Sequence, residues 1–239
     1  MRIFLAGAGG VIGRRLTPLL VRNGHEVVGT TRSVDKAETL RQLGAEPVVV
    51  DVFDADALKH AVVEAKPDAV IHQLTDLPAG PGTPGYAAGQ ERNARLRIEG
   101  TSNLTAAAKA AGVSRMIVQS IAFIYAPGEG LRVETDALDI AADGTRARTV
   151  AGVVALEDTV LALPEGIVLR YGYFYGPGTC YEEAPKPPAV HVDAAAQACL
   201  LALMRGKPGI YNIAEDGEAV SNEKAKRELG FDPRFRLTM

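Results

Sequence analysis

The sequence contains little cysteine, no cluster of basic residues and no long apolar run. Cys180 and Cys199 are its two cysteines, too few and too far apart for a disulfide framework or a metal cluster. Its formal net charge is -3 at pH 7, and no basic stripe is present that could track nucleic-acid phosphates. No apolar stretch approaches the roughly 20 residues that span a bilayer. We therefore expect free thiols, no metal, and neither a nucleic-acid nor a membrane partner.

Length and hydropathy indicate one domain-sized core. The chain has 239 residues, of which 47% are hydrophobic, enough for one α/β domain with a small annex. The apolar run at residues 3–6 ends in glycine and is too short to be the h-region of a secretory signal. A cytoplasmic protein is the expectation.

Short β-branched runs alternate with longer amphipathic stretches rich in alanine and leucine, which is the pattern of βαβ units and a parallel sheet. We predict strands at residues 2–6, 26–31, 47–51, 69–73, 115–120, 167–171 and 210–214. Helices are predicted to begin near Ile12, Val34, Asp54, Tyr86, Arg146 and Asp193. The fold class is α/β, with a doubly wound parallel sheet. Its core comprises residues 1–171, and a short substrate-binding annex at 172–239 is interleaved with the last core helix and strand.

Two segments rich in proline and glycine interrupt the alternation, at residues 77–85 and 175–188. In an open parallel sheet, loops at the carboxyl ends of the strands border the ligand crevice. Both segments are candidate pocket walls, although plain surface connections have the same composition.

A glycine-rich loop joins the first predicted strand to the first predicted helix. One glycine permits a tight turn, a second lets backbone N–H groups approach a pyrophosphate, and a third lets the helix pack close to the strand. The helix N-terminus adds partial positive charge. This context predicts a Rossmann-type site for a nicotinamide dinucleotide. The predicted contacts are Gly7, Gly9, Gly10, Val11, Ile12 and Gly13.

The end of the second predicted strand has no acidic residue to bind a ribose 2′-hydroxyl, about 20 residues after the loop. Arg32 offers a guanidinium suited to a 2′-phosphate instead, with Lys36 nearby. The sequence therefore predicts NADP(H), with NAD as the alternative; a solvated arginine at a strand end is the competing interpretation. Asp51, Val52 and Gln73 complete the predicted cofactor contacts.

Several motifs together resemble one known family. They are Gly-x-x-Gly-x-x-Gly in the loop, Asn93 followed by Gly100-Thr101-Ser102-Asn103-Leu104, Val118-Gln119-Ser120 before Tyr125, and the segment 169–178. The chain resembles the extended or atypical short-chain dehydrogenase/reductases of the NAD-dependent epimerase/dehydratase family. The resemblance extends over nearly the whole chain and implies a Rossmann fold and nicotinamide chemistry.

The catalytic pair that this family usually carries is missing. The family uses a tyrosine and a lysine four residues later, the lysine lowering the tyrosine pKa and holding the cofactor ribose. This sequence has no Tyr-x-x-x-Lys, and the expected positions are occupied by Thr149 and Val153. The serine position is also altered, since Ile121 follows Ser120.

Other residues must therefore be considered for the chemistry. Ser120, Tyr125 and Tyr173 are the candidate catalytic residues, because they lie near predicted carboxyl ends of strands. For each, a structural role is the competing interpretation. Tyr175 and His191 are weaker candidates, and His72 lies inside a strand pattern.

The leading hypothesis is an NADP(H)-dependent oxidoreductase acting on a small carbonyl or alcohol, since a short annex suits a small substrate. An epimerase or dehydratase with transient substrate oxidation is an alternative. A non-catalytic NADP(H)-binding regulatory protein is another. The apolar helix expected at residues 150–163 suits either a homodimer interface or a buried position.

Overall fold

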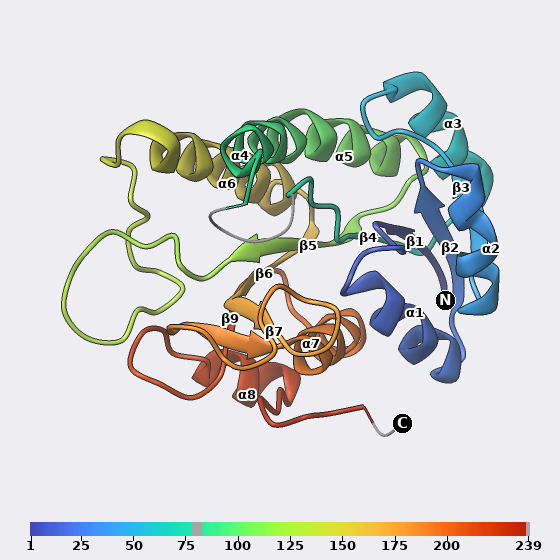
Figure 1. The fold of residues 1–239 in the computed structure, drawn as a ribbon. Helices are drawn as coiled ribbons and strands as arrows, with labels where there is room; N and C mark the ends of the chain where they lie inside the picture. The colour runs from blue at the N-terminus through green and yellow to red at the C-terminus, as the bar shows by residue number, and fades with distance from the viewer. Residues whose placement is uncertain (78–82, 238–239) are drawn as a thin grey trace.

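The computed structural model of the chain describes residues 1–77 and 83–237 and shows a doubly wound α/β sandwich (Figure 1). Its sheet has seven parallel strands in the order β3-β2-β1-β4-β5-β6-β9. The strands are β1 (Arg2–Ala6), β2 (Glu26–Thr31), β3 (Glu46–Val49), β4 (Ala69–His72), β5 (Arg115–Ile121), β6 (Glu165–Tyr171) and β9 (Gly209–Ile213). The predicted Rossmann fold is confirmed.

Helices cover both faces of this sheet (Figure 1). One face carries α1 (Gly13–Arg22), α2 (Ala37–Gln42), α7 (Val192–Arg205) and α8 (Glu223–Leu229). The other carries α3 (Ala55–Ala65), α4 (Tyr86–Arg95), α5 (Thr101–Ala110) and α6 (Gly144–Leu161). Because both faces are buried, the strands read as nearly continuous apolar runs.

The helix expected after β4 contains a break in its regular pattern. Between α4 and α5, residues Leu96–Gly100 form a π-helical turn, η2. Such a turn inserts an extra residue and rotates the side chains that follow relative to those before it. Residues 86–110 contain no proline, so the sequence carries no local signal for this irregularity.

Other small elements also differ from the prediction. A two-stranded sheet pairs β7 (Tyr173–Tyr175) with β8 (Ala189–His191), and runs of this length are too short for a period to be recognised. The helix expected near Val34 begins as a 3-10 turn, η1 (Val34–Lys36). Of the predicted loop at 77–85, residues 78–82 lie outside the described residues.

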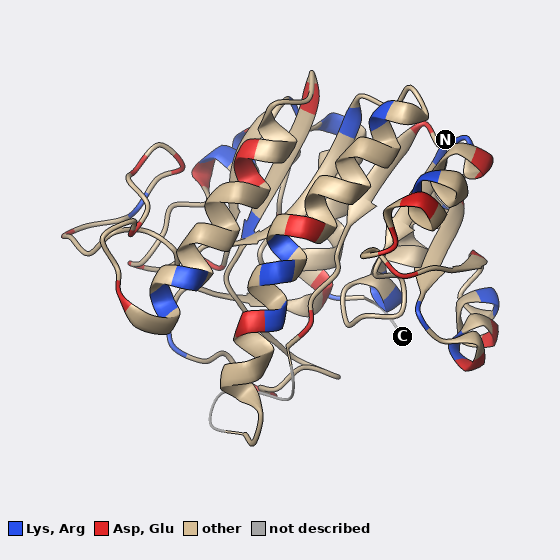
Figure 2. Cartoon of the chain, turned by 90° about the horizontal axis from the view of Figure 1, so that it is seen from above, with Lys and Arg blue, Asp and Glu red and all other residues tan. Residues whose placement is uncertain are grey.

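The surface carries interspersed charges. Figure 2 shows Lys, Arg, Asp and Glu mixed along the helices of the face in view. No helix in the described part of the chain is long and apolar enough to cross a membrane.

Candidate cofactor cleft and active site

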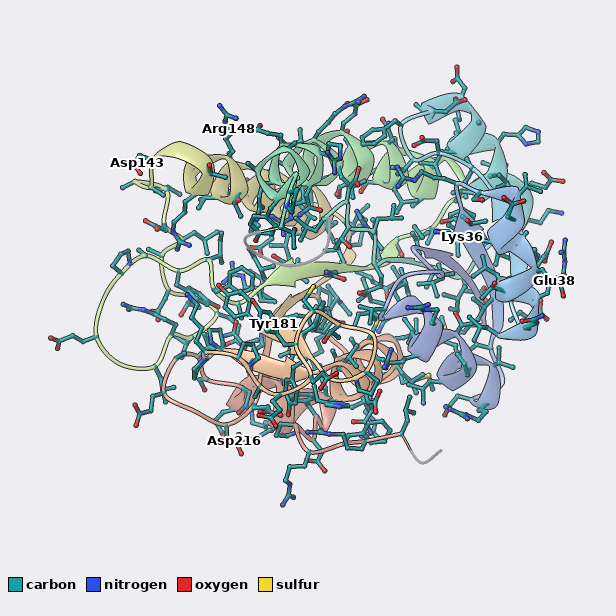
Figure 3. All side chains as sticks on the ribbon, in the orientation of Figure 1. Lys36, Glu38, Asp143, Arg148, Tyr181 and Asp216 are labelled. Atoms are coloured by element: carbon teal, nitrogen blue, oxygen red, sulfur yellow. The ribbon has the colours of Figure 1, made fainter. Side chains whose placement is uncertain are left out.

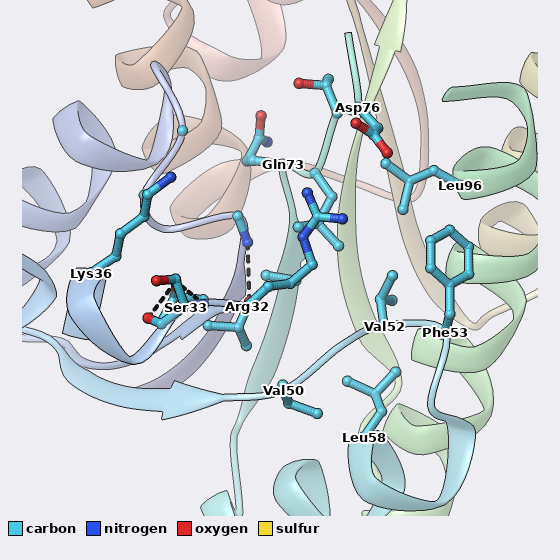
Figure 4. Close-up of a pocket in the computed structure, with 18 residues that line it drawn as sticks. Arg32, Ser33, Lys36, Val50, Val52, Phe53, Leu58, Gln73, Asp76 and Leu96 are labelled. Carbon is cyan, nitrogen blue, oxygen red and sulfur yellow. Dashed lines mark hydrogen bonds between the residues drawn. The ribbon is translucent and has the colours of Figure 1, made fainter. Parts of the chain in front are cut away.

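A cleft of about 390 Å³ opens at the carboxyl ends of the strands, at the point where the strand order reverses between β1 and β4. Its walls are the glycine loop, the end of β2, residues 50–53 after β3, residues 73–76 after β4, and Leu96 of η2 (Figure 4). Open α/β sheets bind their ligands at such a reversal.

The glycine loop fits a dinucleotide pyrophosphate. At Gly7, where φ is 93°, a Cβ atom would lie 2.7 Å from the Gln73 carbonyl carbon. At Gly13, a Cβ atom would lie 2.2 Å from the Gly7 carbonyl oxygen, so only glycine lets α1 approach β1 this closely. At Gly9, by contrast, a Cβ atom would meet nothing within 4 Å. The loop therefore packs closely against the protein at Gly7 and Gly13, and it leaves space for a ligand at Gly9.

The predicted cofactor residues divide into two groups. Those lining the cleft are Gly7, Gly9, Gly10, Arg32, Lys36, Val52 and Gln73. Val11, Ile12, Gly13 and Asp51 do not line it: the Ile12 side chain is buried in the core, and Asp51 accepts a hydrogen bond from the Phe53 backbone at 3.0 Å. Thr31, Ser33, Phe53, Thr75, Asp76 and Leu96 also line the cleft. These residues come from segments after β2, β3 and β4 and from η2, and only the fold brings the segments together, so the sequence does not predict them.

Two cations border the cleft at the β2 end. Figure 4 shows that the Arg32 side chain extends into the cleft and that Lys36 lies at the margin of the cleft. Lys36 is the last residue of η1, directly before α2, and is also labelled in Figure 3. Neither side chain forms an ion pair with any described residue. Both are therefore available to an anionic ligand.

Ser120 and Tyr125 belong to a buried hydrogen-bond network. The Ser120 hydroxyl donates to Glu157 at 2.6 Å, and Arg170 forms a buried ion pair with the same carboxylate at 2.6 Å. Tyr125 donates to Asn212 at 2.6 Å and accepts from Arg170 at 2.9 Å. Burial is the main cause that raises the pKa of Tyr125. Both hydroxyls already have protein partners.

Tyr173 has a different environment. Its ring stacks on Phe123 with centroids 4.0 Å apart and an interplanar angle of 5°. The hydroxyl makes no hydrogen bond to the residues that the structure describes. Burial, followed by the neighbouring phenols of Tyr86 and Tyr181, raises the pKa of Tyr173. This phenol is half-buried, protonated at neutral pH and free to donate.

The weaker candidates have local partners. Tyr175 donates to Glu215 and accepts from Arg236 at 2.9 Å, and burial with the Glu215 bond raises its pKa to about 12. His191 caps α7 by accepting from the Asp193 backbone at 3.2 Å. His72 lies 3.1 Å from the Thr101 hydroxyl, and burial lowers its pKa to about 4.

The α6 face expected to carry the family's pair is largely apolar. Thr149 donates to the Thr145 carbonyl at 3.3 Å, and Val153 is fully buried in a small apolar cluster. One turn further along α6 is Glu157 of the buried network. Neither of the two expected positions carries a cation; the nearest basic residue on this face is Arg146, two turns before Val153, which pairs with Asp139.

Residues 7–163, which hold nearly the whole cleft, match a family model described as NAD(P)H-binding. The chain belongs to the NAD(P)H-binding family. It is 37% identical to a 3-diazoavenalumate denitrifying reductase from a Streptomyces species, over 92% of this chain and 77% of that protein. It is 29% identical to a 2-alkyl-3-oxoalkanoate reductase from Stenotrophomonas maltophilia, over 74% of this chain and 52% of that protein.

Solved structures agree on the fold. A UDP-glucose 4-epimerase from Thermotoga maritima superposes with a TM-score of 0.78 at 18% identity, covering 99% of this chain and 94% of that chain. The predicted resemblance to the short-chain dehydrogenase/reductases of the epimerase/dehydratase family is therefore confirmed.

Proposed function

We propose that the protein is an NADP(H)-dependent reductase that delivers hydride to an electrophilic centre, such as a carbonyl, of a small substrate. The observation that carries the choice of NADP(H) is that Arg32, just after β2, and Lys36 of η1 line the cleft without an ion pair to any described residue. The planar guanidinium at this place can donate two parallel hydrogen bonds to two oxygens of a 2′-phosphate. No carboxylate at the end of β2 competes for a 2′-hydroxyl.

The bound nicotinamide supplies the hydride, and the protein must orient the reactants and provide a proton. Tyr173 is the donor we propose, because its hydroxyl makes no hydrogen bond to a described residue. The hydroxyls of Ser120 and Tyr125, by contrast, already donate to Glu157 and Asn212. A phenol with a raised pKa holds its proton at neutral pH, which suits an acid in the direction of reduction.

The surroundings of Tyr173 favour a flat, anionic substrate. Phe123 and Tyr173 form a stacked aromatic wall, and the Lys186 ammonium lies 5.8 Å from the Tyr173 ring centroid. The two reductase relatives have names that denote carboxylates, an avenalumate and an oxoalkanoate. We therefore propose a small unsaturated or aromatic carboxylic acid as the substrate class.

Turnover tests this proposal. NADPH absorbance is followed with a panel of oxo- and aromatic acids, each paired with its methyl ester. Oxidation of NADPH by acids in preference to esters supports the proposal. Tight NADPH binding with no turnover across the panel favours the non-catalytic regulatory protein instead.

A further inference from the structure

Arg97 is a buried cation that has no hydrogen-bond or ion-pair partner among the described residues. Its side chain belongs to η2, and the residue is 9% exposed. It forms no hydrogen bond and no ion pair within residues 1–77 and 83–237. Burial lowers the pKa of Arg97 to about 10, so the guanidinium remains charged at neutral pH. Leaving such a group buried and unpaired is unfavourable, and a bound ligand would relieve the penalty.

The neighbours of Arg97 do not neutralise it. Glu157 is close enough to act on its charge, but the Glu157 oxygens already accept from Ser120 and Arg170. His72, at the end of β4, is also close and is neutral at pH 7, with its pKa lowered to about 4. The Glu157 carboxylate therefore acts on the charge of Arg97 without forming an ion pair with it.

A second buried donor lies one turn before Arg97. Asn93 is 1% exposed, and its Oδ1 accepts from the Asp76 backbone at 3.0 Å. That bond fixes the orientation of the amide, and its Nδ2 has no acceptor in the described structure. Asp76 and Leu96, the immediate neighbours of these two donors, both line the cleft. Asn93 and Arg97 thus adjoin residues that line the cofactor cleft.

The topology indicates which part of the cofactor comes near. With the adenosine end at Arg32, just after β2, and the pyrophosphate at the glycine loop that follows β1, the nicotinamide end continues toward the carboxyl ends of β4 and β5. His72 ends β4 and Ser120 lies near the end of β5. His72 is close enough for the charge of Arg97 to affect its pKa. Ser120 is linked to Arg97 through Glu157, which accepts its hydrogen bond and acts on the charge of Arg97.

We propose that Arg97, together with Asn93, donates hydrogen bonds to the ribose on the nicotinamide side of bound NADP(H). The π-helical turn η2 packs against α6. At position 153 of α6, the lysine that the family usually carries is replaced by valine. Arg97 thereby supplies from η2 the positive charge that is missing at position 153 of α6, and it positions the nicotinamide for Tyr173. This inference rests on the proposed NADP(H) site, but it does not require turnover.

The test compares two probes by calorimetric titration: NADPH, and adenosine 2′,5′-bisphosphate, which keeps the 2′-phosphate but lacks the nicotinamide ribose. We expect Arg97→Met to weaken NADPH binding by about tenfold or more, the effect of losing a charged hydrogen bond. Binding of the bisphosphate should stay within about twofold. Arg97→Lys should restore part of the NADPH affinity, because it restores the charge.

The matched control is Arg148→Met, an exposed arginine on α6 whose side chain points away from the sheet in Figure 3. It should bind both probes as the wild type does. The Tm without ligand separates a binding role from a structural one: Arg97→Met should leave it unchanged or higher, since an uncompensated buried charge is gone.

Each remaining outcome decides against the proposal. Unchanged NADPH affinity in Arg97→Met overturns it. Equal loss for both probes, or a lower Tm without ligand, assigns Arg97 a purely structural role. If the wild-type protein binds neither probe, the NADP(H) site itself is wrong, and the inference fails with it.

Discussion

Ser120 and Glu157 are joined by a 2.6 Å hydrogen bond that links the end of β5 to the middle of α6. Glu157 also holds Arg170 of β6, so a single carboxylate ties three elements together beneath the site. Ser120, a candidate catalytic residue because it lies near the end of β5, donates its hydroxyl to this carboxylate in the structure.

Removing the charge of Glu157 should be strongly destabilising. Glu157→Gln leaves the buried guanidinium of Arg170 without its counter-ion, which costs about 3–5 kcal/mol when one partner of a buried pair is removed. Glu165→Gln is the control, because its pair with Arg115 is partly exposed and should contribute about 1 kcal/mol or less. Urea denaturation measures both. Equal stability losses in the two variants would contradict a supporting role for Glu157.

Tyr173 and Tyr125 should respond differently to loss of the hydroxyl. We expect Tyr173→Phe to lower kcat by about 10² while leaving Tm unchanged, as for loss of a general acid. Tyr125→Phe should instead lower the free energy of unfolding by about 1–3 kcal/mol, because Asn212 loses a buried partner. Steady-state kinetics and thermal melts distinguish the two. A larger kcat loss in Tyr125→Phe would reverse the assignment.

The pH dependence of reduction follows from the direction of the Tyr173 pKa shift. Burial raises this pKa above the ordinary phenol value of 10.0, so the proton is present throughout the neutral range and is lost only at higher pH. The rate of NADPH-dependent reduction should therefore show no decline assignable to Tyr173 between pH 6 and about 9. A decline near pH 7 that persists in Tyr173→Phe belongs to another group; one that disappears in that variant means that the Tyr173 pKa is depressed.

Alanine substitutions at Gly9 and Gly13 test two different requirements of the glycine loop, ligand access and packing against the protein. Gly9→Ala adds a methyl group into open space toward the cleft, so stability should hold while NADPH affinity falls about tenfold or more. Gly13→Ala forces a methyl group against the Gly7 carbonyl oxygen and should destabilise the fold itself by about 1–3 kcal/mol. Melting curves with and without NADPH give both quantities. A stable, tightly binding Gly13→Ala protein would contradict the loop geometry.

Local sequence signals predicted most of the sheet. Apolar runs bounded by glycine or by aspartate placed every strand of the main sheet, and Asp54 was correctly identified at the start of α3, where its side chain accepts from the Ala57 backbone at 3.0 Å. These features depend on neighbours along the chain, and periodicity reports them directly.

Features that depend on distant partners were not predictable in the same way. The network of Ser120, Glu157 and Arg170 joins residues far apart in sequence, and the burial of Arg97 depends on the π-helical turn against α6. Val50 and Leu96 come together at the cleft only through the strand order. Long-range packing, which no local period encodes, decides the chemical surroundings of the site.

The most direct test of the account is a titration of NADPH and NADH against the wild-type protein, Arg32→Asp and Arg41→Asp. Arg41 is exposed on α2 and pairs with Glu38, so its variant matches the charge change away from the cleft. We expect NADPH to bind more tightly than NADH to the wild type and to Arg41→Asp. In Arg32→Asp, NADPH should weaken by at least about tenfold more than NADH. Equal effects of Arg32→Asp on both nucleotides would contradict a 2′-phosphate site at Arg32.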